Sequence, residues 1–105
     1  MKSFLTNEMS EFLKRFEAKY PQKFQQMFNA FMARYSNLVD EYAQDHHINA
    51  RINPDNGKVE IQDKMFQEEW KYHQENLTES VQDMTILFVA ELQIQEVIEK
   101  QKEVK

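Results

Sequence analysis

Residues 63–99 read DKMFQEEWKYHQENLTESVQDMTILFVAELQIQEVIE and contain neither glycine nor proline. A segment of this length without either helix-breaking residue favours one long helix. Asp63 is suited to cap its start, because an aspartate side chain can accept a hydrogen bond from the first turn. The lysines that follow Glu99 suit the carbonyl end of a helix. The sequence therefore predicts a long third helix over residues 63–102.

The first half of this helix is amphipathic, with apolar side chains on one side and acids on the other. Helical spacing places Phe66, Trp70 and Leu77 on the side that faces the core. Two lysines against nine carboxylates give residues 63–99 a net charge of −7. The acidic side is either an ordinary solvated surface or a docking surface for a basic protein, and both interpretations stay open. Its residues are Glu68, Tyr72, Glu75, Glu79 and Asp83.

The second half, from Met84 to Ile98, is apolar on almost every side. A helix of this kind must be enclosed, either by its own chain or by another. The two preceding helices are shorter, so at about 1.5 Å per residue neither can cover the third along its whole length. We therefore predict self-association, in its commonest form a two-fold dimer. The residues expected to form this contact are Ile86, Leu87, Val89, Leu92, Ile94 and Val97.

Two helices are predicted before this segment. Apolar residues recur at helical spacing from Leu5 to Tyr20 and predict a first helix over residues 3–19, with Ser3 or Thr6 as its cap. Pro21 ends that helix and suits the first turn of the next, predicted over residues 21–45. The second helix carries a wide, aromatic stripe that is typical of a core-facing surface. The stripe consists of Phe24, Phe28, Phe31, Tyr35, Leu38 and Tyr42.

Residues 48–62 break the helical pattern and predict a β-hairpin. Two runs of alternating apolar and polar residues flank the turn sequence Pro54-Asp55-Asn56-Gly57. A four-residue loop pairs Asn53 with Lys58, and the expected register follows from that pair. It sets Ile52 opposite Val59, Arg51 opposite Glu60 and Ala50 opposite Ile61. The predicted fold is mainly α, a single domain over residues 1–105 with three helices and one β-hairpin between the second and the long third.

Composition narrows the class of protein. The 105 residues carry a net charge of −5 and include no cysteine, which excludes disulfides, thiolate zinc sites and cysteine nucleophiles. A small chain without disulfides is typical of the cytoplasm, and the N-terminus lacks the apolar segment of a signal peptide. No apolar run approaches the length of a spanning helix. The excess of acids argues against direct nucleic-acid binding.

The histidines are the main candidates for site chemistry. His46 and His47 follow Asp45, with Glu41 one turn earlier, so the two carboxylates and one imidazole could hold a metal ion. The sequence favours the alternative, a polar helix end with imidazoles near the carbonyl groups. His73 is interpreted as a core histidine with one hydrogen-bond partner. With no catalytic, metal or cofactor motif, we expect no enzyme activity, no cofactor and no resident metal.

Two functions remain as hypotheses. The first is a small non-enzymatic protein–protein interaction module, an adaptor, assembly factor or regulator, that self-associates through its C-terminal helix. The second is an acidic inhibitor, of the kind a phage or mobile element encodes, that binds the basic surface of a nucleic-acid-handling enzyme. A metal-binding or enzymatic helical domain is the least favoured class. In either favoured case the expected partner is another protein.

Overall fold

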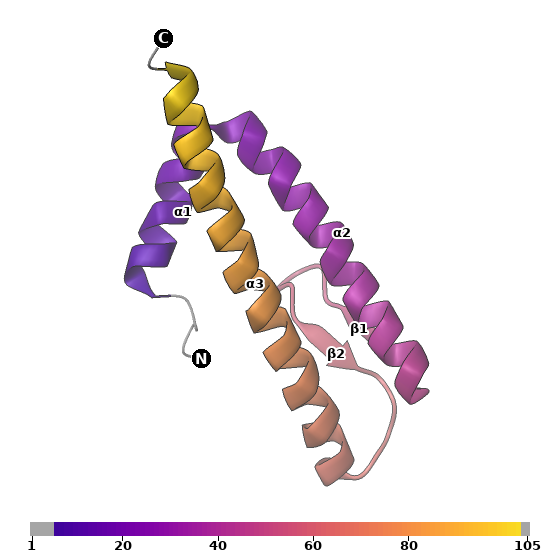
Figure 1. Ribbon diagram of the computed structural model, residues 1–105. Helices are drawn as coiled ribbons and strands as arrows, with labels where there is room; N and C mark the ends of the chain where they lie inside the picture. Colours follow the sequence, from indigo (N-terminus) through magenta and orange to yellow (C-terminus); the bar gives the residue numbers. More distant parts are fainter. Residues whose placement is uncertain (1–5, 104–105) are drawn as a thin grey trace. The chain divides into compact units, whose positions relative to one another are not determined.

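The structure, a computed structural model, describes residues 6–103 and has three helices and a two-stranded hairpin within that range (Figure 1). The predicted fold class and order of elements are confirmed. The hairpin lies between the second helix and the long third one. The elements are α1 (Asn7–Lys19), α2 (Pro21–His46), β1 (Ala50–Ile52), β2 (Val59–Ile61) and α3 (Gln67–Glu103).

The boundary between α1 and α2 is a single residue, Tyr20. The Thr6 hydroxyl caps α1 by accepting a hydrogen bond from the Met9 amide at 3.1 Å. Ser3, the other predicted cap, and the predicted start of this helix lie outside the described residues. At the other end the Tyr20 amide donates to Phe16, while the Tyr20 carbonyl accepts from Phe24. Tyr20 therefore closes one helix and opens the next, as the position of Pro21 predicts.

α2 ends in a left-handed residue, His47, whose φ is 54°. The Ile48 amide donates back to the Ala43 carbonyl at 3.0 Å, and the His47 amide donates to the Gln44 carbonyl at 3.3 Å. This pair of hydrogen bonds is the Schellman arrangement, in which glycine is the usual left-handed residue. The helix therefore stops at His46, although the residue after it carries a side chain.

The hairpin has the predicted register, with Ala50 opposite Ile61 and Ile52 opposite Val59. Backbone hydrogen bonds from Asn53 to Lys58 and from Gly57 to Asn53 close its loop, each at 2.8 Å. Gly57 has a φ of 70°, a conformation that favours glycine. The cross-strand pairs therefore match those expected from the alternating pattern.

Asp63 does not cap α3, so that prediction is wrong. Its carboxylate instead accepts hydrogen bonds from the backbone amide and the side-chain amide of Asn49, at 2.7 and 2.8 Å. These bonds close the base of the hairpin, beside the backbone bond from Gln62 to Asn49. The chain then continues without regular structure until α3 begins at Gln67. The carboxylate is satisfied by the preceding loop rather than by the following helix.

The chain divides into two compact units that are interleaved in sequence. Unit 1 contains the described residues up to Phe31 and from Met84 onward, and unit 2 contains residues 32–83. Both α2 and α3 contribute a segment to each unit. Within residues 6–103 no helix has the length and apolar character needed to cross a membrane.

Unit 1 is built around aromatic rings from all three helices. Phe12 and Phe16 of α1 have their ring centroids 6.0 Å apart, and Phe16 reaches Phe24 of α2 at 6.5 Å. Phe31 of α2 lies 4.8 Å from Phe88 of α3. The buried residues of this unit are Phe12, Phe16, Phe31, Phe88, Val89 and Leu92. Phe31 of the predicted core-facing stripe is thus buried in this core, whereas Phe28 of the same stripe is 37% exposed, which corrects that part of the prediction.

Unit 2 has fewer buried side chains and more polar links. Its buried residues are Tyr35, Val39, Val59 and Leu77. The Tyr35 hydroxyl donates to the Gly57 carbonyl at 2.7 Å and so fastens the hairpin loop to α2. Phe66 and Trp70, predicted to face the core, are instead 81% and 43% exposed. Phe66 directly precedes α3 and Trp70 lies in its first turn, where the core of unit 2 provides no buried place for either ring.

Candidate functional site: two exposed faces of α3

The second half of α3 exposes several aliphatic side chains on one side. Ile86, Leu87, Ile94 and Val97, four of the six residues predicted to mediate self-association, are 49–63% exposed. Ile98, at 40%, and the small Ala90 are exposed as well. We name this surface the aliphatic face and define it as Ile86, Leu87, Ala90, Ile94, Val97 and Ile98.

Val89 and Leu92 do not belong to this face. Both were predicted to mediate self-association, but Val89 is 3% exposed and Leu92 is fully buried in the core of unit 1. Their side of α3 lies within unit 1, whose core also takes buried rings from α1 and α2. Periodicity identified the apolar stretch correctly but could not separate its covered side from its open side.

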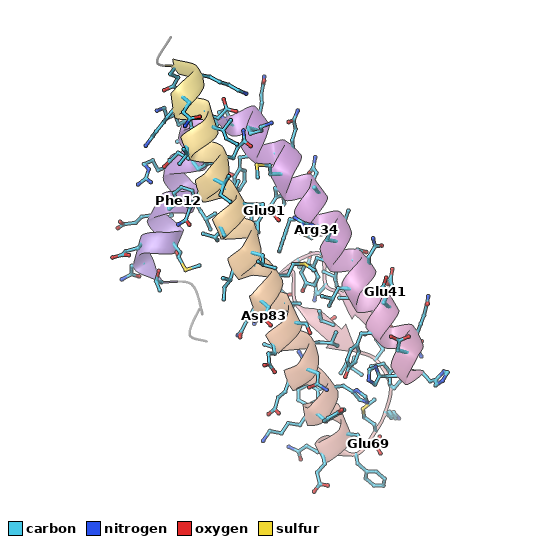
Figure 2. All side chains as sticks on the ribbon, in the orientation of Figure 1. Phe12, Arg34, Glu41, Glu69, Asp83 and Glu91 are labelled. Carbon is cyan, nitrogen blue, oxygen red and sulfur yellow. The ribbon has the colours of Figure 1, made fainter. Side chains whose placement is uncertain are left out.

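The first half of α3 carries the acidic face, which we define as Glu68, Tyr72, Glu75, Glu79 and Asp83. All five side chains are exposed, and Figure 2 labels Asp83 on α3. Glu75 forms a loose ion pair with Lys71 of the preceding turn at 4.0 Å. An exposed pair of this kind contributes little to stability, so Glu75 can turn toward an incoming cation at small cost.

Sequence reasoning missed one feature of this region, the exposure of Phe66 and Trp70. Glu68 and Glu69 lie between them in sequence and are exposed too. Large aromatic residues are frequent anchors at protein interfaces. Helical spacing by itself assigns both rings to the core side. Their position at the beginning of the helix was the available signal that they would be exposed.

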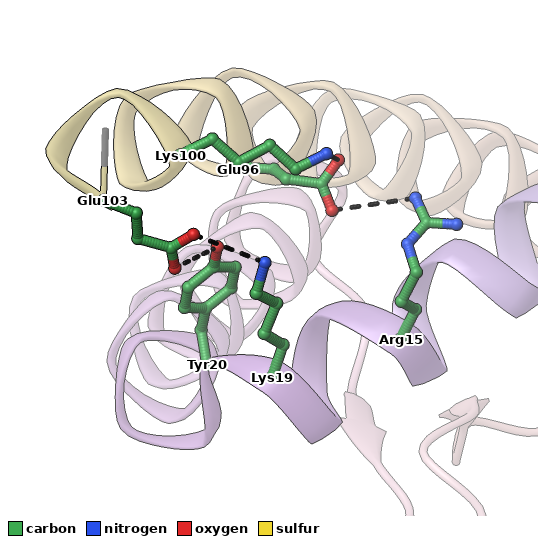
Figure 3. A network of polar contacts seen from close by, with 6 residues as sticks. All are labelled: Arg15, Lys19, Tyr20, Glu96, Lys100 and Glu103. Atoms are coloured by element: carbon green, nitrogen blue, oxygen red, sulfur yellow. Dashed lines mark hydrogen bonds and ion pairs between the residues drawn. The ribbon is translucent and has the colours of Figure 1, made fainter.

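Polar contacts fasten α1 to the C-terminal end of α3 (Figure 3). Glu96 forms ion pairs with Arg15 at 3.6 Å and with Lys100 at 3.5 Å. Glu103 accepts a hydrogen bond from the Tyr20 hydroxyl at 3.1 Å and pairs with Lys19 at 3.5 Å.

The surroundings of Lys19 are those of a paired surface cation. Its hydrogen bond with Tyr20 raises the pKa of the Lys19 ammonium, and the negative charge of Glu103 raises it further. Lys19 therefore stays charged across the ordinary pH range. These contacts hold α1 along one side of α3 and use charges that lie outside the aliphatic face.

His73 belongs to a small polar cluster in unit 2. Its Nδ1 shares a hydrogen bond of 2.7 Å with the Tyr42 hydroxyl, which also accepts from the Asn76 side chain at 3.3 Å. The His46 ring stacks on Tyr42 with centroids 3.9 Å apart, and His46 Nδ1 is bonded to the Tyr42 carbonyl. Tyr42 thus positions both imidazoles. His73 has the single side-chain partner that was predicted, but it is half-buried rather than a core residue.

The residues of the metal alternative do not come together. His47 lines a shallow hollow with Asp40 and Asn49, whereas Glu41 and Asp45 line another that contains no histidine. Within residues 6–103 no three histidine or acidic side chains converge as a metal site requires. The described side chains instead form two exposed surfaces, the aliphatic face and the acidic face.

No protein-family model matches this chain, and comparisons with curated proteins and with solved structures found no match.

Proposed function

We propose that this chain is a small non-enzymatic protein–protein interaction module, an adaptor, assembly factor or regulator, that forms a homodimer through the aliphatic face. One observation carries the proposal: five large aliphatic side chains on a single helix segment, each 40% exposed or more. A chain without cysteine suits the cytoplasm, where we place its action.

The size of the aliphatic face supports this proposal. Its side chains leave on the order of 500 Å² of apolar surface open, comparable to the largest patch on a typical monomer, which is often functional. Each of Ile86, Leu87 and Ile94 would gain roughly 1–2 kcal/mol on losing its remaining contact with water. Only part of that gain appears as affinity, because association also costs entropy.

The test is the mass of the particle in solution. Light scattering after size exclusion should give twice the 12.7 kDa of one chain. Leu87→Glu and Ile94→Glu should each give the single-chain mass with an unchanged helical circular dichroism spectrum, because both side chains are exposed within the chain. Burying a carboxylate in the dimer contact would cost several kcal/mol.

Thr78→Glu provides the matched control. Thr78 is exposed on the first half of the same helix, so this variant adds the same charge outside the aliphatic face. It should keep the double mass. A wild-type protein that stays at the single-chain mass at high micromolar concentration would refute the dimer.

A second function is favoured by the acidic face. We propose as the alternative that the chain is an acidic inhibitor, of the kind a phage or mobile element encodes, whose acidic face covers the basic surface of a nucleic-acid-handling enzyme. The supporting observation is that all five of its side chains are exposed. Its carboxylates would supply steering and specificity toward a basic surface.

Charge reversal tests this alternative. Glu75→Lys with Glu79→Lys should abolish capture of a basic enzyme from host extract, and high salt should weaken the wild-type complex. Glu8→Lys with Glu11→Lys is the control, because it makes the same change in net charge on the exposed side of α1. Equal capture by wild type and the α3 double variant would contradict the inhibitor hypothesis.

A further inference from the structure

The aliphatic face varies along the helix in the size of its side chains and in the charge at its two ends, and this variation favours one orientation of two paired helices. We propose that two copies of this chain dimerise with their α3 helices antiparallel, about a two-fold axis level with Leu92, so that Ala90 of each copy packs against Ile94 of the other. This inference rests on the proposed self-association and adds its orientation and residue pairs.

The spacing of the face fits a helix–helix seam. The apolar positions recur at steps of three, four and three, at Leu87, Ala90, Ile94 and Val97. A further step of four leads back to Asp83 at one end and forward to Gln101 at the other. Such a repeat keeps one narrow strip of the helix against its partner. In an antiparallel pair centred at Leu92, each seam residue meets a different one. Leu87 then packs on Val97, and Ala90 packs on Ile94.

Side-chain volume favours this orientation over the parallel one. In a parallel pair each residue would meet its own copy, so Ala90 would face Ala90 and leave a gap, while Ile94 would face Ile94 one turn later. The antiparallel pair instead sets the small residue against the large one in both central layers. Cores pack best when large and small residues alternate across facing positions.

Charge at the two ends of the seam favours the same orientation. A parallel pair would set the exposed carboxylate of Asp83 beside that of the other copy. The antiparallel pair sets Asp83 beside Gln101 and Lys100 of the other copy. Within its own chain the Lys100 ammonium pairs with Glu96 at 3.5 Å, and the Lys100 side chain remains 56% exposed and accessible to the Asp83 carboxylate of a second copy. The opposed helix dipoles add a small favourable contribution.

The area of the face suits a modest interface. A stable protein–protein contact buries about 800 Å² on each partner, and the aliphatic face supplies on the order of 500 Å² of apolar centre. Polar side chains along its edges, Gln93 and Gln101 among them, would form the rim. The area therefore fits a modest contact with a second copy of this chain, which presents the same face.

Cysteine crosslinking distinguishes the two orientations, because the chain contains no cysteine of its own. The Asp83→Cys and Gln101→Cys variants are prepared separately, one of them with a size tag. Each variant by itself, and then a mixture of the two, is treated with a short bis-maleimide crosslinker. In the antiparallel pair the two copies of position 83 lie roughly 27 Å apart along the helix. The mixture should therefore crosslink and neither variant alone should do so. Thr78→Cys serves as the collision control.

A volume swap provides a second test that does not depend on crosslinking. Ala90→Ile and Ile94→Ala should each weaken the dimer, with Ile94→Ala raising its dissociation constant about 100-fold because two cavities form per dimer. The double variant restores one large and one small residue in each layer and should return to within about tenfold of wild type. All variants should keep the helical spectrum, because both positions are exposed within the chain.

The outcomes of these tests distinguish failure of the antiparallel pairing from failure of self-association itself. Crosslinking of either single variant alone, or a double variant no better than Ile94→Ala, would overturn the antiparallel pairing while the dimer itself stands. A wild-type dimer without any crosslink would overturn it too. A wild-type protein that remains a single chain in light scattering would refute self-association and the pairing together.

Discussion

Unit 1 and unit 2 are held together by different forces. Among the residues that the structure describes, unit 1 buries six apolar side chains, and its rings contact one another from Phe12 to Phe88. Unit 2 buries four and relies on directed bonds, such as those from Tyr35 to Gly57 and from Asn49 to Asp63. Apolar burial supplies more stability per side chain than a partly exposed hydrogen bond. Removing one buried side chain should therefore lower the free energy of unfolding more in unit 1 than in unit 2.

The largest expected effect comes from the core of unit 1. Leu92→Ala should lower the free energy of unfolding by about 3 kcal/mol, because the leucine is fully buried and its removal leaves a cavity. Chemical denaturation followed by circular dichroism measures the loss. Lys14→Ala, at an exposed position of α1 in the same unit, should change stability by less than about 0.5 kcal/mol. Equal effects at both positions would show that the unit 1 core is not packed as described.

In unit 2, replacing the Asp63 carboxylate should lower the free energy of unfolding by about 1 kcal/mol, because two hydrogen bonds to Asn49 are lost from an exposed site. Asp63→Ser is the informative variant, since serine caps helices as well as aspartate does but cannot reach both Asn49 donors. Denaturation of this variant at neutral pH measures the cost. No loss would favour a capping role for residue 63 in solution.

Tyr35→Phe should also cost about 1 kcal/mol, because the hydroxyl donates to Gly57 from a buried position. Burial raises the pKa of the Tyr35 hydroxyl above its ordinary value of 10.0. The folded state therefore holds this proton more tightly than the unfolded state, and its contribution is complete below pH 10 and is lost as the pH rises further. The deficit of the variant should shrink in denaturation series above pH 10. A deficit that is constant with pH would contradict this.

The smallest effect has the opposite sign. His47→Gly should raise the free energy of unfolding by about 0.5 kcal/mol, because glycine adopts the left-handed conformation of this helix end without strain. Thermal melts compared with wild type measure the gain. Gln44→Gly, inside the same helix, should lower stability by about 1 kcal/mol. A loss at both positions would indicate that His47 contributes contacts that outweigh its strain.

Much of the fold was predictable because its signals are local. Pro21 marks the helix boundary, the turn from Pro54 to Gly57 sets the hairpin register, and the absence of glycine and proline after Asp63 keeps α3 continuous. The start of α3 was placed too early, because the Asp63 carboxylate is equally suited to a cap and to a loop. Only the position of Asn49 decides between them.

The exposed faces were predictable in part. All five residues of the acidic face are exposed as expected, because acids at helical spacing remain in water whatever packs on the other side. Phe66 and Trp70 followed the core stripe in spacing, yet no core extends to the start of α3 to receive them. Spacing describes one helix, whereas burial also depends on what lies opposite.

The sequence of α3 alone therefore determines a helix with an acidic first half and an apolar second half, because hydrophobic periodicity and helix propensity act within a few turns. It does not distinguish Leu87 from Leu92, two leucines on one apolar helix. Tertiary packing decides that Leu92 is buried in unit 1 while Leu87 remains in contact with water. The physical reason is that burial requires a partner surface, and α1 and α2 supply rings on one side of the helix.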